Sequence, residues 1–366
     1  MQRKLSVICF IDSLGAGGAQ RQIVGLANQL YKKAEYDVQM LVYHDVNFFQ
    51  SSLDAGIELH ILPESSNIKR IFNAYRYIKR EKPDWVISFL ESPSIISCIA
   101  KVFYHHFKLI VSERNTTQHT GRKERLRFNL FRIADYVVPN AYSQEKFIKD
   151  NFHFLQHKTT TIANFVDLKH FSFTARERHP IPQIVVAATI WKPKNTLNFI
   201  HAVKILIDKN VNISVKWFGL SKNASNADYE YYKRCCELIE ELGIGEHIKL
   251  LEKTKDIKSE YCKADYFCLP SFYEGTPNVI CEAIATGLPI ICSNVCDNGI
   301  YVEEGVNGFL FDPNDINDIA DKIIKAVSIT DSEWIAYCHN SRKIAETKLD
   351  IERFTHQYAT LLGEDN

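Results

Sequence analysis

The sequence lacks any apolar run that approaches the ~18 residues needed to span a bilayer. Its opening apolar run stops at Asp12 and does not have the form of a signal peptide. Low-complexity tracts and short repeats are also missing. We therefore expect a globular protein of the cytoplasm, at most peripheral on the inner face of the cell membrane.

Metal-binding patterns are missing as well. Ten cysteines are present, but no two form a Cys-x-x-Cys pair, and most lie in apolar runs. Such cysteines are typical of small buried hydrophobic residues in a reducing compartment. The sequence also has no Asp-x-Asp motif. We expect neither a metal site nor a bound cofactor.

The chain as a whole carries no net charge, because 44 Lys and Arg balance 44 Asp and Glu. The balance is uneven: residues 1–170 hold 23 basic and 16 acidic side chains, whereas residues 171–366 hold 21 and 28. A basic half favours an anionic partner such as phosphate, anionic lipid or nucleic acid, although even spreading over a solvated face is the commoner arrangement. The length of 366 residues predicts two domains of ordinary size.

Strand-length apolar runs alternate with helical periodicity, which predicts an α/β fold of parallel sheets wound with helices. In the first half the predicted strands are Leu5–Ile11, Asp37–Tyr43, Glu58–Leu62, Trp85–Phe89, Leu109–Ser112 and Tyr136–Pro139, and the predicted helices are Ala19–Tyr31, Ile68–Glu81 and Lys123–Ala134. In the second half the predicted strands are Ile184–Ala188, Ser214–Phe218, His247–Leu251, Tyr266–Leu269, Pro289–Cys292 and Gly308–Phe311. We expect two Rossmann-like domains that face each other across a cleft.

A polar, proline-bearing stretch separates the two alternations. It covers residues 174–183 and is the predicted linker. The first domain is then 1–173 and the second is 184–349. Residues 350–366 form an amphipathic helix at the end of the chain.

The most informative segment is Glu-Gly-Thr-Pro-Asn-Val-Ile-Cys-Glu, from Glu274 to Glu282, between two strand-like runs. Gly275 lets the backbone approach a ligand closely, and Pro277 can open the helix that follows. Free amides at that helix start favour an anion. A carboxylate is repelled by phosphate, so the two glutamates are better suited to accept hydrogen bonds from the hydroxyls of a sugar or ribose. The alternative is that both are exposed helix-end charges.

This segment, with its flanks from Leu269 to Ile291, resembles the donor site of glycosyltransferase family 4, a group of retaining GT-B enzymes that use nucleotide-sugars. The resemblance extends to Glu304–Leu310, which is similar to the closing turn of the family. It implies that Glu274 contacts hydroxyls of the transferred sugar and that Glu282 binds the ribose. It further implies donor contacts by the loop between them, at Gly275, Thr276, Pro277, Asn278 and Val279. The final helix would cross back onto the first domain.

Two more loops are similar to family motifs. A glycine-rich turn with Gly17 and Gly18 follows the first strand, where exposed amides can meet a ligand. It lacks the third glycine of the dinucleotide fingerprint, and a simple tight turn is an equal alternative. The loop after Val185–Ala188 carries Lys192, Lys194 and Asn195, and a lysine there can neutralise a diphosphate leaving group. Thr189 stands where the family usually has arginine, and Lys192 cannot reproduce a bidentate fork.

The acceptor side is described by fewer signals. Glu113, Arg114 and Asn115 follow a predicted strand, and we expect them to bind the acceptor, with a salt-bridged loop as an equal alternative. The family often has a histidine near this point, and His119 is the nearest one here. Asn140 and Asn164 resemble family turns, although Phe165 replaces a usual glycine.

Two basic amphipathic segments can lie in an anionic lipid interface. They are Ile68–Lys82 and Arg122–Arg132. The alternative for each is a helix that packs by its apolar stripe and keeps its basic residues in water.

We expect from these features a retaining, metal-independent glycosyltransferase. It would transfer a hexose or N-acetylhexosamine from a nucleoside-diphosphate sugar, UDP-linked, to a lipid-linked glycan of bacterial surface polysaccharide synthesis, such as capsule or O-antigen. Nucleic acid is not an expected partner. The alternatives are a non-catalytic adaptor or chaperone subunit with the same fold, and a nucleotide-sugar epimerase. A dehydrogenase is disfavoured because the dinucleotide fingerprint fails.

Overall fold

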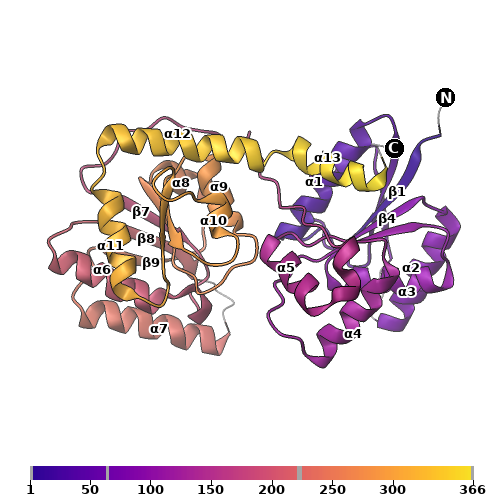
Figure 1. Ribbon diagram of the computed structural model, residues 1–366, viewed down its shortest axis with the longest axis horizontal. Helices are drawn as coiled ribbons and strands as arrows, with labels where there is room; N and C mark the ends of the chain where they lie inside the picture. Colours follow the sequence, from indigo (N-terminus) through magenta and orange to yellow (C-terminus); the bar gives the residue numbers. More distant parts are fainter. Residues whose placement is uncertain (1–2, 63–65, 221–224, 364–366) are drawn as a thin grey trace. The chain divides into compact units, whose positions relative to one another are not determined.

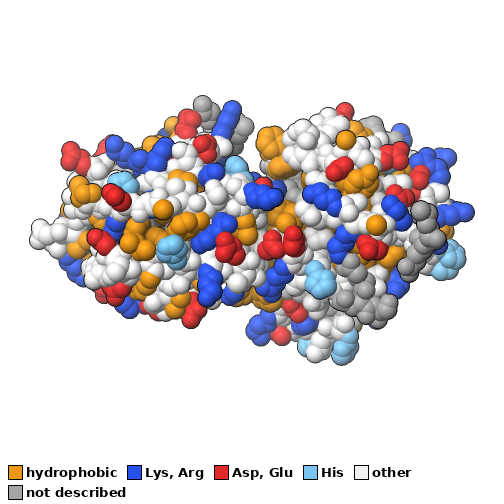
Figure 2. All heavy atoms as spheres, turned by 90° about the horizontal axis from the view of Figure 1, so that it is seen from above, with side chains coloured by type: hydrophobic (Ala, Val, Ile, Leu, Met, Phe, Trp, Pro, Cys, Tyr) orange, Lys and Arg blue, Asp and Glu red, His pale blue; other side chains and the backbone are white. Residues whose placement is uncertain are grey.

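The chain folds into two compact units, seen in a computed structural model that describes residues 3–62, 66–220 and 225–363. Unit 1 comprises Met1–Phe165 together with Ile351–Asn366, and unit 2 comprises Val166–Asp350. Each unit is a parallel sheet with helices on both faces (Figure 1). On the face seen in Figure 2, basic and acidic side chains are interspersed on both units.

Unit 1 contains a six-stranded parallel sheet. Its strands are β1 (Leu5–Phe10), β2 (Tyr36–Val42), β3 (Glu58–Ile61), β4 (Trp85–Phe89), β5 (Lys108–Ser112) and β6 (Tyr136–Val137). Its helices are α1 (Gly18–Lys32), α2 (Asn67–Glu81), α3 (Glu91–Phe103), α4 (Arg122–Leu130), α5 (Tyr142–Asn151) and α13 (Ile351–Leu362). The core has two layers, because α1 and α13 cover one face of the sheet and α2, α3 and α5 cover the other.

Unit 2 repeats this plan with its own six strands. They are β7 (Gln183–Ala187), β8 (Ser214–Leu220), β9 (Ile248–Glu252), β10 (Tyr266–Leu269), β11 (Ile290–Ser293) and β12 (Gly308–Phe311). The helices are α6 (Thr196–Asp208), α7 (Asn226–Glu241), α8 (Ile257–Cys262), α9 (Asn278–Ala285), α10 (Asn298–Tyr301), α11 (Ile316–Val327) and α12 (Asp331–Lys348). One continuous apolar core joins this sheet to its helices, with α11 packed on α6 and α12 on α9.

Both sheets have the same strand order. It is β3-β2-β1-β4-β5-β6 in unit 1 and β9-β8-β7-β10-β11-β12 in unit 2. This is the order of a Rossmann fold, in which the winding direction reverses between the first and fourth strands. The predicted fold of two Rossmann-like domains is therefore confirmed. Ligands of such sheets bind beyond the carboxyl ends of the strands at the reversal, here β1 and β4, and β7 and β10.

The boundary between the units lies earlier than the sequence predicts, at Phe165 instead of residue 173. The backbone amide of Val166 donates to the carbonyl of Leu349, 2.9 Å away, and Arg342 donates to the carbonyl of Phe171 at 2.9 Å. These contacts fasten residues 166–173 to unit 2. Helix α13 belongs to unit 1, whose core it completes with Phe354 and Tyr358.

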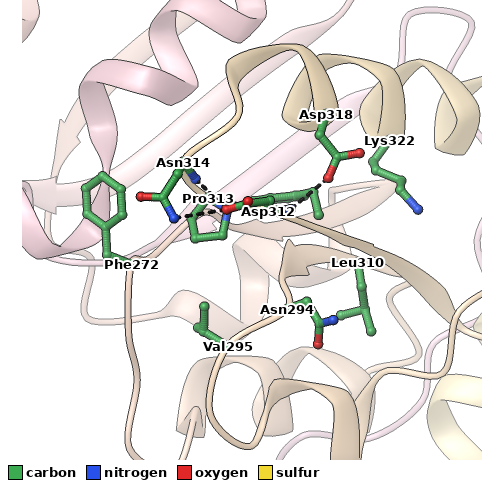
Figure 3. Close-up of a pocket in the computed structure, with 10 residues that line it drawn as sticks. Phe272, Asn294, Val295, Leu310, Asp312, Pro313, Asn314, Asp318 and Lys322 are labelled. Atoms are coloured by element: carbon green, nitrogen blue, oxygen red, sulfur yellow. Dashed lines mark hydrogen bonds between the residues drawn. The ribbon is translucent and has the colours of Figure 1, made fainter. Parts of the chain in front are cut away.

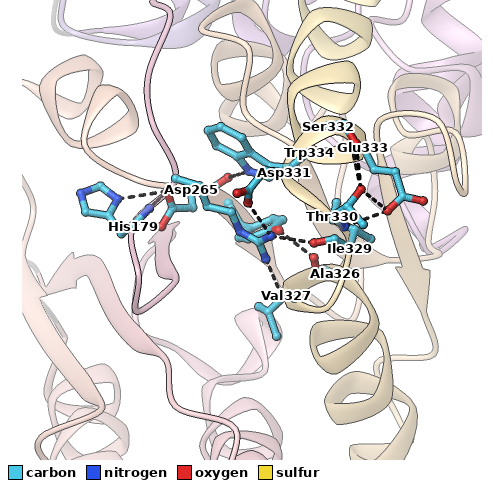
Figure 4. Close-up of polar contacts among 12 residues, drawn as sticks. His179, Asp265, Ala326, Val327, Ile329, Thr330, Asp331, Ser332, Glu333 and Trp334 are labelled. Atoms are coloured by element: carbon cyan, nitrogen blue, oxygen red, sulfur yellow. Dashed lines mark hydrogen bonds and ion pairs between the residues drawn. The ribbon is translucent and has the colours of Figure 1, made fainter.

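The predicted linker, residues 174–183, packs against unit 2 and is not a free connection. Arg176 donates to the carbonyls of Tyr261 and Thr286, and Arg178 to those of Val327 and Ile329. Figure 4 shows the neighbouring contacts. The fully buried carboxylate of Asp265 accepts from the amides of His179 and Gln183 at 3.1 and 2.7 Å. A polar stretch predicts a linker, but here the side chains of Arg176 and Arg178 donate hydrogen bonds to backbone carbonyls of unit 2.

Two further properties concern the described residues only. Within residues 3–62, 66–220 and 225–363, no helix has the length and apolar character to cross a membrane. In the same part of the chain, no cluster of three His, Cys, Asp or Glu side chains could hold a metal ion.

Candidate functional site

A lysine and a glutamate meet at the reversal point of the unit 2 sheet. Lys194 lies in the loop after β7, and Glu274 lies in the loop after the neighbouring strand β10. Their side chains form an ion pair of 2.6 Å between Nζ and Oε1 and are 20% and 11% exposed. The pair therefore stands where a Rossmann sheet binds its ligands and remains within reach of one.

The loop that carries Lys194 is held in place by contacts with neighbouring segments of unit 2. The indole Nε1 of Trp217 donates to the carbonyl of Ala188 at 2.7 Å. Gly219 faces the same carbonyl, and a Cβ at this position would lie 1.8 Å from its oxygen, so the close approach requires glycine. Asn195 has a left-handed backbone, with φ of 61°, and its side chain donates to the carbonyl of Pro313 at 2.7 Å. Asparagine tolerates this conformation and so sets the direction of Lys194.

The loop that carries Glu274 is held by its own neighbours. The hydroxyl of Ser271 donates to Oε1 of Glu274 at 2.5 Å, and Ser271 is fully buried at the end of β10. The amide of Phe272 donates to the carbonyl of Pro193 at 2.9 Å, which ties this loop to the loop of Lys194. The Oε1 atom of Glu274 thus receives both Lys194 and Ser271.

Helix α9 follows this loop and begins at Asn278, with Pro277 as its N-cap. This agrees with the predicted opening by Pro277. Glu282 lies on α9 and is half-buried. Burial of Tyr261 raises the pKa of its hydroxyl, and the negative charge of Glu282 raises that pKa further. Glu282 and Glu274 are therefore on separate elements, a helix and a loop, and the ribose role of Glu282 stays a prediction.

The remaining predicted donor residues of unit 2 surround these two loops. Gly275, Thr276 and Val279 are half-buried, Asn278 is exposed, and the amide of Asn278 donates to the carbonyl of Thr276 at 2.9 Å. Lys192 is exposed in a short 3-10 turn, Lys192–Lys194. These positions are accessible, and their contacts with a donor stay predictions.

The glycine-rich turn of unit 1 follows β1 and is organised by Asp12. The carboxylate of Asp12 accepts from the amide of Ser13 at 2.6 Å and from the side chain of Gln20 at 2.9 Å. Gly17 is the N-cap of α1 and Gly18 is its first residue. Gln20, at the predicted third-glycine region, thus braces the turn from inside the helix.

The predicted acceptor residues after β5 differ from one another in exposure. Glu113 is buried and lies 3.6 Å from Nε of Arg127. Arg114 donates to Asn164 at 2.6 Å and to the hydroxyl of Tyr358 at 2.7 Å. Asn115 is exposed. Glu113 and Arg114 are therefore engaged in contacts inside unit 1, and Asn115 is the member of this set that an acceptor can reach directly.

Arg127 is a buried cation that the sequence did not single out. It donates to Glu91 at 2.7 Å and to Thr117 at 2.7 Å, and it faces Glu113. Glu91 follows β4 at the reversal point of unit 1 and its side chain is 48% exposed. Burial raises the pKa of Glu113 to about 7, against the lowering effect of Arg127. The only signal in the sequence is the position of Glu91 directly after a predicted strand.

A pocket of about 550 Å³ opens beside these loops but does not contain the ion pair (Figure 3). Its walls come from the ends of β11 and β12 and from α11, and they include Phe272 of the Glu274 loop. Its polar groups bind one another: Asp312 accepts from Asn314 at 2.9 Å, and the amide of Asp312 donates to Asp318 at 2.7 Å. Lys322 is paired with Glu304 at 2.7 Å. Lys194 and Glu274 are not among the residues that line this pocket.

Known proteins resemble the chain, one of them over almost its whole length and another over about half of it. One relative is the Campylobacter jejuni enzyme GalNAc-alpha-(1->4)-GalNAc-alpha-(1->3)-diNAcBac-PP-undecaprenol alpha-1,4-N-acetyl-D-galactosaminyltransferase, 24% identical over 99% of this chain and 98% of that protein. Another is the Escherichia coli enzyme UDP-Gal:alpha-D-GlcNAc-diphosphoundecaprenol alpha-1,3-galactosyltransferase, 28% identical over 52% of this chain. That match spans 44% of the E. coli enzyme, less than half of its length.

Solved structures resemble the fold. A glycosyltransferase from Rickettsia africae superposes with a TM-score of 0.85 at 15% identity, covering 99% of both chains. Anabaena HepE in complex with UDP superposes with a TM-score of 0.81 at 18% identity, covering 98% of this chain and 100% of that one. These likenesses confirm the predicted GT-B fold.

Two family models match adjoining parts of the sequence. The model described as Glycosyltransferase Family 4 matches residues 16–170, and the model described as Glycosyl transferases group 1 matches residues 169–342. The first covers most of unit 1, and the second covers the Lys194 and Glu274 loops. The chain therefore belongs to glycosyltransferase family 4, the GT-B glycosyltransferases.

Proposed function

We propose that this protein is a retaining glycosyltransferase that moves a hexose or N-acetylhexosamine from a UDP-sugar to a lipid-linked glycan. The observation that carries the proposal is the Lys194–Glu274 pair at the reversal point of the unit 2 sheet. A cation beside a carboxylate suits a ligand in which a diphosphate adjoins a group rich in hydroxyls. The UDP-Gal donor in the name of the E. coli relative and the undecaprenol-linked acceptors in the names of both relatives support the same substrate classes.

In this proposal each residue of the pair has one task. Lys194 neutralises the diphosphate as the bond from the sugar anomeric carbon to the phosphate oxygen breaks. Glu274 accepts hydrogen bonds from sugar hydroxyls and fixes the ring. An acceptor oxygen bonds to the anomeric carbon on the face that the diphosphate leaves, and the acceptor proton passes to the leaving phosphate. No step requires a metal ion.

Unit 1 binds the acceptor in this proposal. Glu91 and Asn115 are polar groups after β4 and β5 that solvent reaches. Arg127 holds Glu91 from the interior by a hydrogen bond of 2.7 Å. Glu91 is thus the candidate that replaces the buried Glu113 in the acceptor role.

The direct test is a transfer assay with purified protein, a synthetic polyprenyl-diphosphate glycan and a panel of UDP-sugars. We expect one UDP-sugar to be consumed and the new linkage, followed by NMR, to keep the anomeric configuration of the donor. Turnover should persist in EDTA. Inversion of configuration would refute the retaining mechanism. Binding of UDP-sugar without turnover on any acceptor would favour the alternative hypothesis of a non-catalytic adaptor subunit.

We also propose peripheral contact with anionic membrane through helix α2. Its surface combines Ile68 and Phe72, which are 79% and 54% exposed, with the exposed cations Lys69 and Arg76. Helix α4 is less suited, because Arg127 and Phe128 of that helix are buried. Co-sedimentation with anionic vesicles should exceed that with neutral vesicles, and Phe72→Ser should reduce it. Equal partitioning in both vesicle types would refute the contact.

A further inference from the structure

The two charges proposed for donor recognition pair with each other in the structure. Lys194 Nζ lies 2.6 Å from Glu274 Oε1, and both side chains are largely shielded from solvent. Ser271 adds a second donor to the same oxygen at 2.5 Å. Two opposite charges attract each other more strongly when they are shielded from solvent than when they lie on an open surface. Any ligand that draws Lys194 away must therefore compensate Glu274.

A diphosphate and a sugar differ in what they offer this pair. A diphosphate attracts Lys194 but repels Glu274, because both are anionic. Sugar hydroxyls can donate to Glu274 but do not attract Lys194 strongly. A sugar-nucleotide supplies both partners at once, and a bare nucleoside diphosphate supplies only the first. The terminal phosphate of the bare diphosphate also carries more negative charge near neutral pH than the esterified phosphate of the donor.

We propose that the Lys194–Glu274 pair discriminates the sugar-nucleotide from the bare nucleoside diphosphate and thereby promotes release of the spent nucleotide after transfer. The inference rests on the proposed function, because it assigns the diphosphate to Lys194 and the sugar to Glu274. Once the sugar has left, Glu274 has lost its hydroxyl partners and competes with the diphosphate for Lys194. Re-formation of the pair then weakens the hold on the product.

The geometry of the two loops favours this competition. The backbone hydrogen bond from the amide of Phe272 to the carbonyl of Pro193, 2.9 Å long, keeps the loops at a fixed spacing. Ser271 is fully buried, so it keeps Oε1 of Glu274 directed at Lys194. Lys194 has a flexible stem and three donor hydrogens, so it can turn to a phosphate with the loops in place. Glu274 acts here as a specificity-determining residue against the product.

The test is calorimetric titration of the full chain with UDP, UDP-galactose and UDP-N-acetylgalactosamine. In Glu274→Gln the lysine has no competing carboxylate, so UDP should bind about fivefold more tightly than to the wild type. The preferred UDP-sugar should bind more weakly, so the ratio of the two dissociation constants shifts in favour of UDP. The constant for UDP as a product inhibitor should fall in parallel in any variant with residual turnover.

Two further variants make the test specific. Glu274→Asp retracts the carboxylate by one methylene and should tighten UDP by a smaller factor. Asp321→Asn removes the partner of Lys209 from an exposed pair of 3.1 Å on helix α11 and should leave UDP affinity unchanged. Thermal melting in the absence of ligand checks that each variant is folded.

The outcomes separate the two levels of the argument. If folded Glu274→Gln and Glu274→Asp both bind UDP no more tightly than the wild type, the discrimination is refuted while donor binding stands. If the wild type binds neither UDP nor a UDP-sugar, the proposed donor is refuted and the discrimination with it.

Discussion

The reversal points of the two sheets have the same topology but use charge in opposite ways. In unit 2, Lys194 and Glu274 pair near the surface, on loops directly after β7 and β10. In unit 1, Glu113 and Arg127 are sealed inside, and Glu91 alone of this cluster reaches solvent. A partly exposed pair can exchange its partner for a ligand, whereas a fully buried cluster supports the shape of the loops around it. We therefore expect Lys194 and Glu274 of unit 2 to take part in the chemistry and the Arg127 cluster of unit 1 to position its loops.

Removal of Lys194 is the strongest test of the unit 2 half of this comparison. Lys194→Met should lower kcat about a thousandfold, or about 4 kcal/mol, because the leaving diphosphate loses its cation. Initial rates with saturating donor measure the effect. Lys209→Met, which removes an exposed lysine of an ion pair elsewhere on unit 2, should leave kcat unchanged. A similar loss in both variants would point to general damage to unit 2.

Removal of Arg127 tests the unit 1 half. Arg127→Met leaves Glu113 buried without its cation and frees Thr117 and Glu91, so the free energy of unfolding should fall by about 4 kcal/mol. Urea denaturation measures it. Arg125→Met, on the exposed side of the same helix, is the matched control and should change stability little. Equal stability of the two variants would contradict a positioning role.

Glu113 should give unit 1 a distinct dependence on pH. Its pKa rises from 4.5 to about 7 in the folded protein, so the folded state holds a proton that the unfolded state has released. Its contribution to stability is therefore complete below pH 4.5 and is lost as pH rises through 7. As pH rises from 4.5 to 8, the free energy of unfolding of Glu113→Gln should increase by up to about 3 kcal/mol relative to that of the wild type. A constant difference between the two unfolding free energies over this range would show that Glu113 is ionised throughout.

The smallest effect is expected at the hydroxyl of Tyr358. Tyr358→Phe removes the acceptor for Arg114 and should cost about 1 kcal/mol of stability. Arg114 keeps Asn164 and its stacking on Phe89, so the fold should survive. Thermal melting measures the loss, with the exposed Tyr229→Phe of unit 2 as control. A loss of several kcal/mol would mean that Arg114 depends on Tyr358 far more than this contact indicates.

The sequence predicts the sheets well and the contacts between distant segments poorly. Every strand of the described residues was predicted, and the signal is strongest for β4, β10 and β11, which are buried along their whole length. Helix α3 escaped notice because it opens with Glu-Ser-Pro-Ser, which is typical of a turn, and its proline lies in the first turn, where a helix tolerates it. The boundary near residue 173 was misplaced because a polar composition does not reveal that Arg176 and Arg178 cap carbonyls of unit 2.

The candidate site divides in the same way. Glu274 and Glu282 can be proposed as site residues from the sequence, because one short segment carries the whole motif. Arg114 was predicted as an acceptor ligand because its partner Tyr358 stands 244 residues away, and sequence order does not reveal that contact. Ser271 and Arg127 emerge only from the geometry, since a serine after a strand and an arginine on a basic helix have no distinctive pattern.

The discontinuity of unit 1 has a consequence for biosynthesis. Helix α13 packs against α1 and contributes Phe354 and Tyr358 to the core of unit 1, yet it follows the whole of unit 2 in the chain. Unit 2 is one continuous stretch, Val166–Asp350, and its segments all emerge before α13 does. One face of the sheet of unit 1 therefore stays uncovered during synthesis until α13 has been made. The nascent chain is most exposed to aggregation and to chaperone binding at that face, and a truncation before Ile351 would leave it uncovered.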